Sequence, residues 1–157
     1  MMILLRRAGL VAALLLPGLR PGTALAQDAA AEVRTVIEQL FEGMRLSDGA
    51  RVRAVFHPQA RMGSAVLRNG ALAFAPEGAE AFIAAVGAPK QVVWDERISH
   101  LRIEVDGPLA SAWMDYVFYA GTQRSHCGVN AMQLVRAAAG WQIVSLVDTR
   151  RREGCPE

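Results

Sequence analysis

The second half of the chain reads as four strand-like segments that follow one another with short connections. They span residues 92–105, 109–119, 124–136 and 141–150, and each is rich in β-branched and aromatic side chains. Asp106-Gly107-Pro108 ends the first segment with a strong turn signal. Because connections this short join antiparallel neighbours but not parallel ones, the segments predict an antiparallel meander.

The first half of the chain has helical periodicity instead. Its apolar residues recur at intervals of three and four and form one stripe, made of Val33, Val36, Ile37, Leu40, Phe41 and Met44. Asp28 precedes the stripe and is predicted to cap this helix. A second, shorter helix is expected from Ser47-Asp48 to His57, since Pro58 disfavours helical geometry in the residue before it.

A hairpin and a third helix are predicted between the second helix and the meander. Asn69-Gly70 favours a tight turn between strands at residues 62–67 and 71–75. Pro76-Glu77 then opens a helix that ends near Gly87 and Pro89. Helices first and strands later indicate an α+β fold, in which three N-terminal helices pack on a curved antiparallel sheet that forms a pocket.

Residues 1–26 have the layout of a cleaved secretory signal. Arg6-Arg7 gives a positive start, residues 8–16 form an apolar run, and Ala24-Leu25-Ala26 fits a cleavage site. The run is too short for the roughly 20 residues that span a bilayer. We therefore expect a signal peptide at residues 1–26 and a single domain at residues 27–157. The domain is expected to be periplasmic or secreted, with no stable membrane anchor.

Removal of the signal changes the charge of the protein. The full chain carries a formal charge of +2, and the signal contains three arginines but no acid, so the remaining domain carries −1. No basic stripe with interleaved aromatic residues is present, which argues against a nucleic-acid partner. Cys127 and Cys155 are the only cysteines. In an oxidising compartment such a pair favours a disulfide, and two separate thiols are the alternative.

The order of helices, hairpin and meander resembles the nuclear-transport-factor-2-like (NTF2-like) superfamily, which includes SnoaL-like polyketide cyclases and ketosteroid isomerases. Residues 56–60, Phe-His-Pro-Gln-Ala, and residues 140–143, Gly-Trp-Gln-Ile, add to the resemblance, which covers about residues 30–152. Residues 125–130 and 148–151 look like a secreted or periplasmic branch of the superfamily. The resemblance implies a cone-shaped fold with a pocket and leaves the activity open, because this fold hosts enzymes, binding modules and interaction domains.

Candidate site residues follow from the strand register, since side chains alternate between the two faces of a sheet. If Tyr119 pairs with Arg124 and Arg136 pairs with Trp141, one face is nearly all apolar and the other mixes aromatic and polar groups. The mixed face is the predicted pocket wall, with ligand-binding residues Trp113, Tyr119, Asn130 and Trp141. Arg97, on the first long strand, is a further candidate that could bind an anion.

Asp115 and His126 are the predicted acid–base pair on that wall. In this register they are diagonal neighbours, so Asp115 could abstract a proton beside a carbonyl group while His126 donates to the oxyanion. A buried network that only holds the sheet together is the alternative for both residues. The three histidines have no metal-ligand spacing, and there is no Gly-rich phosphate loop, so we expect neither a metal nor a cofactor.

Three functions are compatible with these patterns. The first is binding of a small, largely apolar molecule in the pocket. The second is a lyase or isomerase that uses Asp115 and His126. The third is a homodimeric interaction domain that pairs through the apolar face around Met114, Tyr116, Phe118 and Val129.

Overall fold

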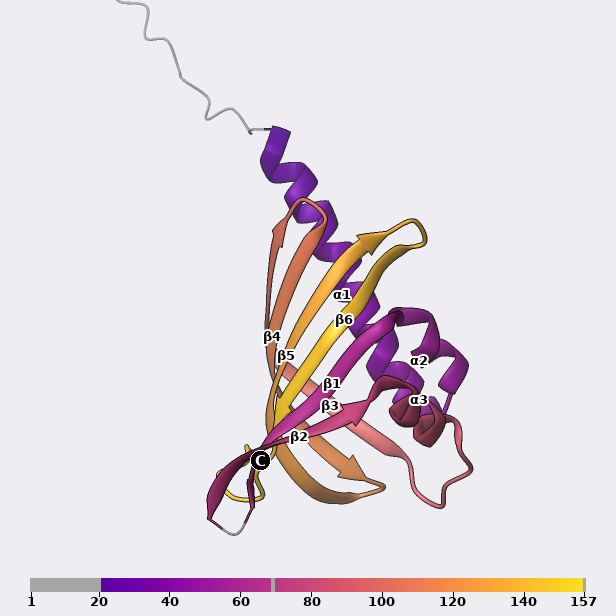
Figure 1. Ribbon diagram of the computed structural model, residues 1–157, viewed down its shortest axis with the longest axis vertical. Helices are drawn as coiled ribbons and strands as arrows, with labels where there is room; N and C mark the ends of the chain where they lie inside the picture. The colour runs from indigo at the N-terminus through magenta and orange to yellow at the C-terminus, as the bar shows by residue number, and fades with distance from the viewer. Residues whose placement is uncertain (1–20, 69, 157) are drawn as a thin grey trace, which may run out of the picture.

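The computed structural model describes residues 21–68 and 70–156 and consists of three helices and one six-stranded sheet. The helices are α1 (Pro21–Leu46), α2 (Gly49–Val55) and α3 (Ala79–Gly87). The strands are β1 (Phe56–Arg68), β2 (Ala71–Gly78), β3 (Trp94–Asp106), β4 (Leu109–Ala120), β5 (Gln123–Ala137) and β6 (Gly140–Thr149). The α+β class is therefore confirmed, with the helices on one face of a curved sheet (Figure 1).

The strand order in the sheet is β2-β1-β6-β5-β4-β3. Strands β3 to β6 pair with their sequence neighbours in antiparallel fashion, which confirms the predicted meander. β1 and β2 form the predicted hairpin around Gly70, whose positive φ of 78° suits glycine. The contact between β1 and β6 is parallel, and no sequence pattern indicated it.

Helix α1 buries the stripe that its periodicity predicts. Val33, Ile37 and Leu40 are completely buried, and the helix packs across β3 and β6 and against α2. The helix begins at Pro21, so Asp28 lies inside it and is not its cap. The prediction was wrong because the residues before Asp28 continue the helix.

Helix α2 begins where the sequence predicts, while α3 begins later. The Asp48 side chain caps α2 by accepting a hydrogen bond from the Arg51 backbone N–H at 2.9 Å. Pro76 and Glu77 do not open α3, because they still pair with β1 as part of β2. Proline is tolerated there because β2 is an edge strand, with one side free of ladder hydrogen bonds.

The hydrophobic core lies between the helices and the concave face of the sheet. The sheet contributes buried residues from β1, β4, β5 and β6, which include Met62, Ala112, Met114, Met132, Leu134, Ile143 and Leu146. Figure 1 shows α1 running diagonally across this face, with α2 and α3 together near one end. The opposite, convex face carries exposed side chains such as Trp113.

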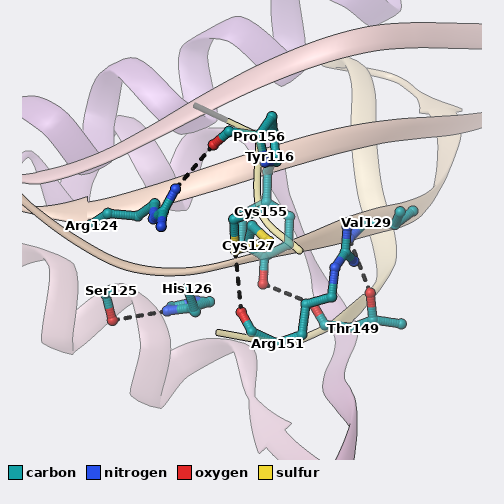
Figure 2. The surroundings of a disulfide bond; sticks show 10 residues. All are labelled: Tyr116, Arg124, Ser125, His126, Cys127, Val129, Thr149, Arg151, Cys155 and Pro156. Atoms are coloured by element: carbon teal, nitrogen blue, oxygen red, sulfur yellow. Dashed lines mark hydrogen bonds between the residues drawn. A yellow bond between two sulfur atoms is a disulfide. The ribbon is translucent and has the colours of Figure 1, made fainter. Parts of the chain in front are cut away.

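The predicted disulfide between Cys127 and Cys155 is present, with a Cα–Cα distance of 5.6 Å (Figure 2). It fixes the C-terminal segment to β5. Arg151 and Cys127 also exchange two backbone hydrogen bonds, each 2.9 Å long. Cys127 is completely buried, although it occupies a position on the convex face.

The predicted signal peptide lies largely outside the described residues, and only its last six positions fall within α1. Within the described part of the chain, no helix is both long and apolar enough to cross a membrane.

Candidate functional site

A small cavity of about 40 Å³ lies between the helices and the concave face of the sheet. Most of its wall is apolar and is supplied by α1, α3, β1 and β6. These residues are Leu40, Phe41, Met44, Met62, Phe82 and Leu146. The polar part of the wall comes from β2, β3, β5 and the end of β6, and consists of Glu77, Glu96, Asn130, Asp148 and Arg150. An apolar wall with a few convergent polar groups is typical of a ligand site.

Glu96 and Asn130 form the first polar contact of this wall. The Asn130 Nδ2 donates a hydrogen bond to Glu96 Oε1 at 2.7 Å, across the intervening strand β4. Glu96 keeps some exposure, but its carboxyl group is surrounded by protein. Burial, followed by repulsion from Asp148, raises the pKa of Glu96 from its ordinary value of 4.5 to about 7, against the opposing effect of the Asn130 hydrogen bond.

Asp148 is the centre of the second polar contact. Its Oδ2 accepts a hydrogen bond from the Arg150 Nε at 2.7 Å and another from the Tyr116 hydroxyl at 3.1 Å. Its Oδ1 is buried and has no hydrogen-bond partner among the described residues. A buried carboxylate oxygen without a donor is costly, so this atom is an unsatisfied hydrogen-bond acceptor next to the cavity.

Tyr116 connects this contact to the C-terminal segment. Its hydroxyl also donates to the Thr149 backbone carbonyl at 2.9 Å, and the side chain is almost completely buried. Burial, with a further contribution from the charge of Asp148, raises the pKa of Tyr116 well above its ordinary value. The phenol therefore stays protonated and serves as a fixed donor to Asp148.

The strand register explains which predicted residues reach this site. Tyr119 pairs with Arg124, as predicted, but Ser125 is an extra residue that bulges out between Arg124 and His126. His126 therefore lies opposite Phe118. A bulge shifts all the following pairs by one residue and so exchanges the faces of a strand.

This shift separates the predicted acid–base pair. Asp115 pairs with Val129 on the convex face, whereas His126 lies on the concave face with Phe118, on which its ring stacks at 5.0 Å. The predicted grouping of Asp115 with His126 is therefore wrong. Burial lowers the pKa of His126, with the nearby Arg150 as the second cause.

Asp115 has a different histidine partner. Its Oδ2 lies 2.9 Å from Nδ1 of His100, a residue with a positive φ of 51° at a bulge of β3. Trp113, 48% exposed, lies beside this pair on the convex face. None of these side chains lines the cavity between helices and sheet.

Of the five predicted ligand-binding residues, only Asn130 lines the cavity. Tyr119 and Arg97 lie together on the convex face, where the Arg97 guanidinium stands 4.4 Å from the Tyr119 ring centre and pairs with Asp95. Trp141 is buried on the concave face but is tied to α1, because its Nε1 donates to Glu32 at 3.0 Å. No contact brings Trp113, Tyr119, Asn130 and Trp141 to one wall.

Sequence reasoning missed Glu96 and Asp148 as cavity residues, and it missed Tyr116 as a hydrogen-bond partner of Asp148. Glu96 has no predicted site role, and Tyr116 is predicted to lie on the apolar face. Asn130 and Asp148 pair directly across β5 and β6, but only because of a bulge that the sequence does not indicate. A directly paired Asn and Asp in two otherwise apolar strand faces indicates a buried polar cluster.

No group of three or more His, Cys, Asp and Glu side chains within residues 21–68 and 70–156 is arranged to hold a metal ion.

The helices, the curved sheet and the cavity between them define an NTF2-like domain. A family model described as "Putative lumazine-binding" matches residues 28–147, most of the chain, and the chain belongs to this family. No curated protein matches the sequence.

Solved structures with the same fold are numerous. A protein of unknown function from Mycobacterium tuberculosis has a TM-score of 0.68 and 15% sequence identity, over 86% of this chain and 78% of that one. An NTF2-like protein with a cystatin-like fold from Novosphingobium aromaticivorans has a TM-score of 0.64 and 16% identity, over 85% and 88%. An NTF2-like protein of unknown function from Shewanella baltica has a TM-score of 0.60 and 21% identity, over 81% and 96%. At these identities the likeness establishes the fold alone.

Proposed function

We propose that this protein binds a small, largely apolar molecule in the cavity between α1, α3 and the sheet. The observation that carries the proposal is the composition of the wall, in which six apolar side chains surround one cluster of polar groups. The apolar part supplies affinity by removing ligand surface from water, and the polar cluster fixes the orientation of the ligand. The description of the family as lumazine-binding is in keeping with a small-molecule ligand.

The size of the cavity limits how the ligand enters. A water molecule needs about 10–15 Å³ of such space, so 40 Å³ holds roughly three waters. A larger ligand requires an adjustment of the wall. Helix α3 is the element best suited to move, because it has nine residues and packs mainly on α2, β1 and β2. Its Phe82 lines the cavity and is only partly buried.

Two measurements test the binding proposal. Native mass spectrometry of protein purified from the organism's own cell envelope is expected to detect a retained small molecule. Nuclear magnetic resonance titration with lumazine and with small aromatic fragments is expected to shift the amide signals of Phe82, Asn130 and Leu146. Signals of Trp113 and Asp115, on the convex face, serve as the internal control. Shifts confined to the convex face, or none with any compound, would contradict the proposal.

A second candidate function is proton abstraction, as in a lyase or isomerase. The observation in its favour is Glu96, whose pKa of about 7 suits a general base at neutral pH, in a cavity that a small carbonyl compound could enter. We place the base at Glu96 because Asp115 is remote from the cavity.

Hydrogen exchange tests this second candidate directly. A small ketone such as cyclohexanone, incubated with the protein in D₂O, is expected to lose its α-protons faster than in buffer. Glu96→Gln should abolish the acceleration, and Asp106→Asn, at an exposed carboxylate on β3, should preserve it. Loss of exchange in Asp115→Asn instead would return the role of base to the residue that the sequence suggested.

Export and dimerisation remain predictions for this protein. The disulfide is compatible with an oxidising compartment. Cleavage after Ala26 keeps the core residues from Ala29 onward, and N-terminal sequencing of the mature protein tests it. A dimer cannot use the predicted apolar face, because Met114 and Tyr116 are almost completely buried within the protein. Sedimentation at micromolar concentration tests whether another surface pairs two copies.

A further inference from the structure

We propose that the polar end of the cavity recognises a hydrogen-bond donor or cation on the ligand, such as an amidine, an amine or an amide N–H, and that it rejects carboxylates and phosphates. This inference rests on the proposed binding function and adds the chemical class of the group that the polar cluster takes.

The first argument is the unpartnered oxygen of Asp148. The residue lines the cavity, is only 7% exposed, and its Oδ1 accepts no hydrogen bond from any described residue. A carboxylate oxygen can only accept hydrogen bonds, so its natural complement is an N–H or O–H group. Oδ1 itself has almost no accessible surface, so a ligand donor reaches it only after the wall adjusts, and it then removes the cost of burying Oδ1 unpaired.

The second argument is that the donors around the cavity are already committed. Asn130 directs its amide to Glu96, and the hydroxyl of Tyr116 serves Asp148 and Thr149. Arg150 directs its Nε to Asp148 and also pairs with Glu77 at 3.6 Å. An anionic ligand would therefore have to compete with existing acceptors for the Asn130 amide, the Tyr116 hydroxyl and the Arg150 Nε.

The third argument is the charge of the wall. Glu77, Glu96 and Asp148 are acidic and Arg150 is the one base in the lining, so acidic groups are in excess. The excess holds even when Glu96 is protonated. In a partly dehydrated site such an excess attracts a cation and repels an anion.

A matched series of benzamidine, benzamide and benzoate tests the inference. The three probes have almost the same shape and differ in whether the head group is a cationic donor, a neutral amide or an anionic acceptor. Binding is measured by calorimetry or by the amide shifts of Asn130 at pH 8, where Glu96 is ionised. We expect benzamidine to bind about tenfold or more tightly than benzoate, with benzamide between them, since charge-assisted hydrogen bonds are the stronger ones.

Two variants test which residues cause the preference for benzamidine over benzoate. Asp148→Asn, which replaces an acceptor oxygen by a donor amide, should remove the preference for benzamidine, whereas Asp106→Asn makes the same change on the surface and should keep it. Should Asp148→Asn fail to fold, Glu96→Gln carries the test and is expected to reduce the benzamidine-to-benzoate ratio severalfold.

The possible outcomes separate this inference from the binding proposal. Equal or tighter binding of benzoate overturns the inference while the binding function stands. The inference is also overturned, and the binding function again stands, if benzamidine does not bind and native mass spectrometry detects an anionic ligand. If the purified protein retains no ligand and binds none of the fragments, the proposed binding function itself is contradicted. An unchanged preference in both Asp148→Asn and Glu96→Gln also overturns the inference.

Discussion

The hydroxyl of Tyr116 lies 3.1 Å from Oδ2 of Asp148 and joins β4 to β6 across the intervening strand β5. The space between them exists because Gly128, the residue opposite Tyr116, has no side chain. Arg150 holds the same carboxylate from the other side. The side chains of the polar cluster are therefore held by the strands of the sheet, and each of them can be replaced separately by mutation.

Removal of the Tyr116 hydroxyl should destabilise the fold. Tyr116→Phe deletes the donor to both Asp148 and Thr149, and a lost hydrogen bond to a buried charged group costs about 1–3 kcal/mol of unfolding free energy. Urea denaturation measures the change. Tyr119→Phe is the matched control on the convex face and should change the stability little. Equal effects of both variants would contradict the role given to Tyr116.

Glu96 should make stability depend on pH in an unusual direction. Its folded pKa of about 7 exceeds the ordinary value of 4.5, so the folded protein binds the extra proton within this window. The unfolding free energy from this group therefore falls as the pH rises from about 4.5 to about 7. Glu96→Gln should remove that fall and be more stable than the parent protein at pH 8.

The comparison of the two proteins across pH isolates the Glu96 contribution. The pKa of His126 is lowered, so this residue affects the unfolding free energy in the opposite direction. Its contribution to the unfolding free energy decreases as the pH falls below the ordinary pKa of 6.5, because the folded protein keeps His126 neutral while the unfolded chain protonates it. That contribution is present in both proteins and cancels in the difference. Parallel pH profiles for the parent and the variant would mean that the pKa of Glu96 is the same in the folded and unfolded states.

Gly128 should not tolerate a side chain. A Cβ atom there would stand 1.8 Å from the Thr149 carbonyl oxygen, a backbone atom that cannot move without disturbing β6. Gly128→Ala is expected to cost more than about 3 kcal/mol, in the range of severe overpacking. Gly78→Ala, where a Cβ would make only an ordinary contact with the Ala81 Cβ at 3.9 Å, should cost less than about 1 kcal/mol. Thermal unfolding of the two variants provides the comparison.

The disulfide should contribute substantially to stability. Cys127 and Cys155 are separated by 28 residues, and closing a loop of this length stabilises a fold by about 3–4 kcal/mol in the chain-entropy model. The double variant Cys127→Ala/Cys155→Ala should show this loss in denaturant, with no further effect of reductant. A parent protein whose unfolding midpoint is insensitive to reductant would contradict the prediction.

Much of the fold could be predicted because it depends on local patterns. The stripe from Val33 to Met44 specifies one helix face, and the turn at Asn69-Gly70 specifies one hairpin. The four strands of the meander begin and end within about two residues of their predicted limits. These features arise from residues close together in the sequence.

The site could not be predicted in the same way, because it depends on the bulges. Ser125 inserts one residue into β5, and Val144 does the same in β6, where Leu134 pairs with Ile143 but Gln133 pairs with Ser145. Neither residue carries a sequence signal for a bulge. Each one nevertheless decides which side chains face the helices, so Asp115 is directed outward and Asp148 inward.

The parallel contact of β1 with β6 has a consequence for how the chain folds. It pairs Phe56 with Ile143 and Ala65 with Thr149, so the sheet is completed only when the last strand is available. Contacts between such distant segments must overcome a large loop-closure entropy and are slow to form. A nascent chain that lacks its final residues therefore has no complete sheet. Formation of the native sheet is therefore delayed until the last strand has been synthesised.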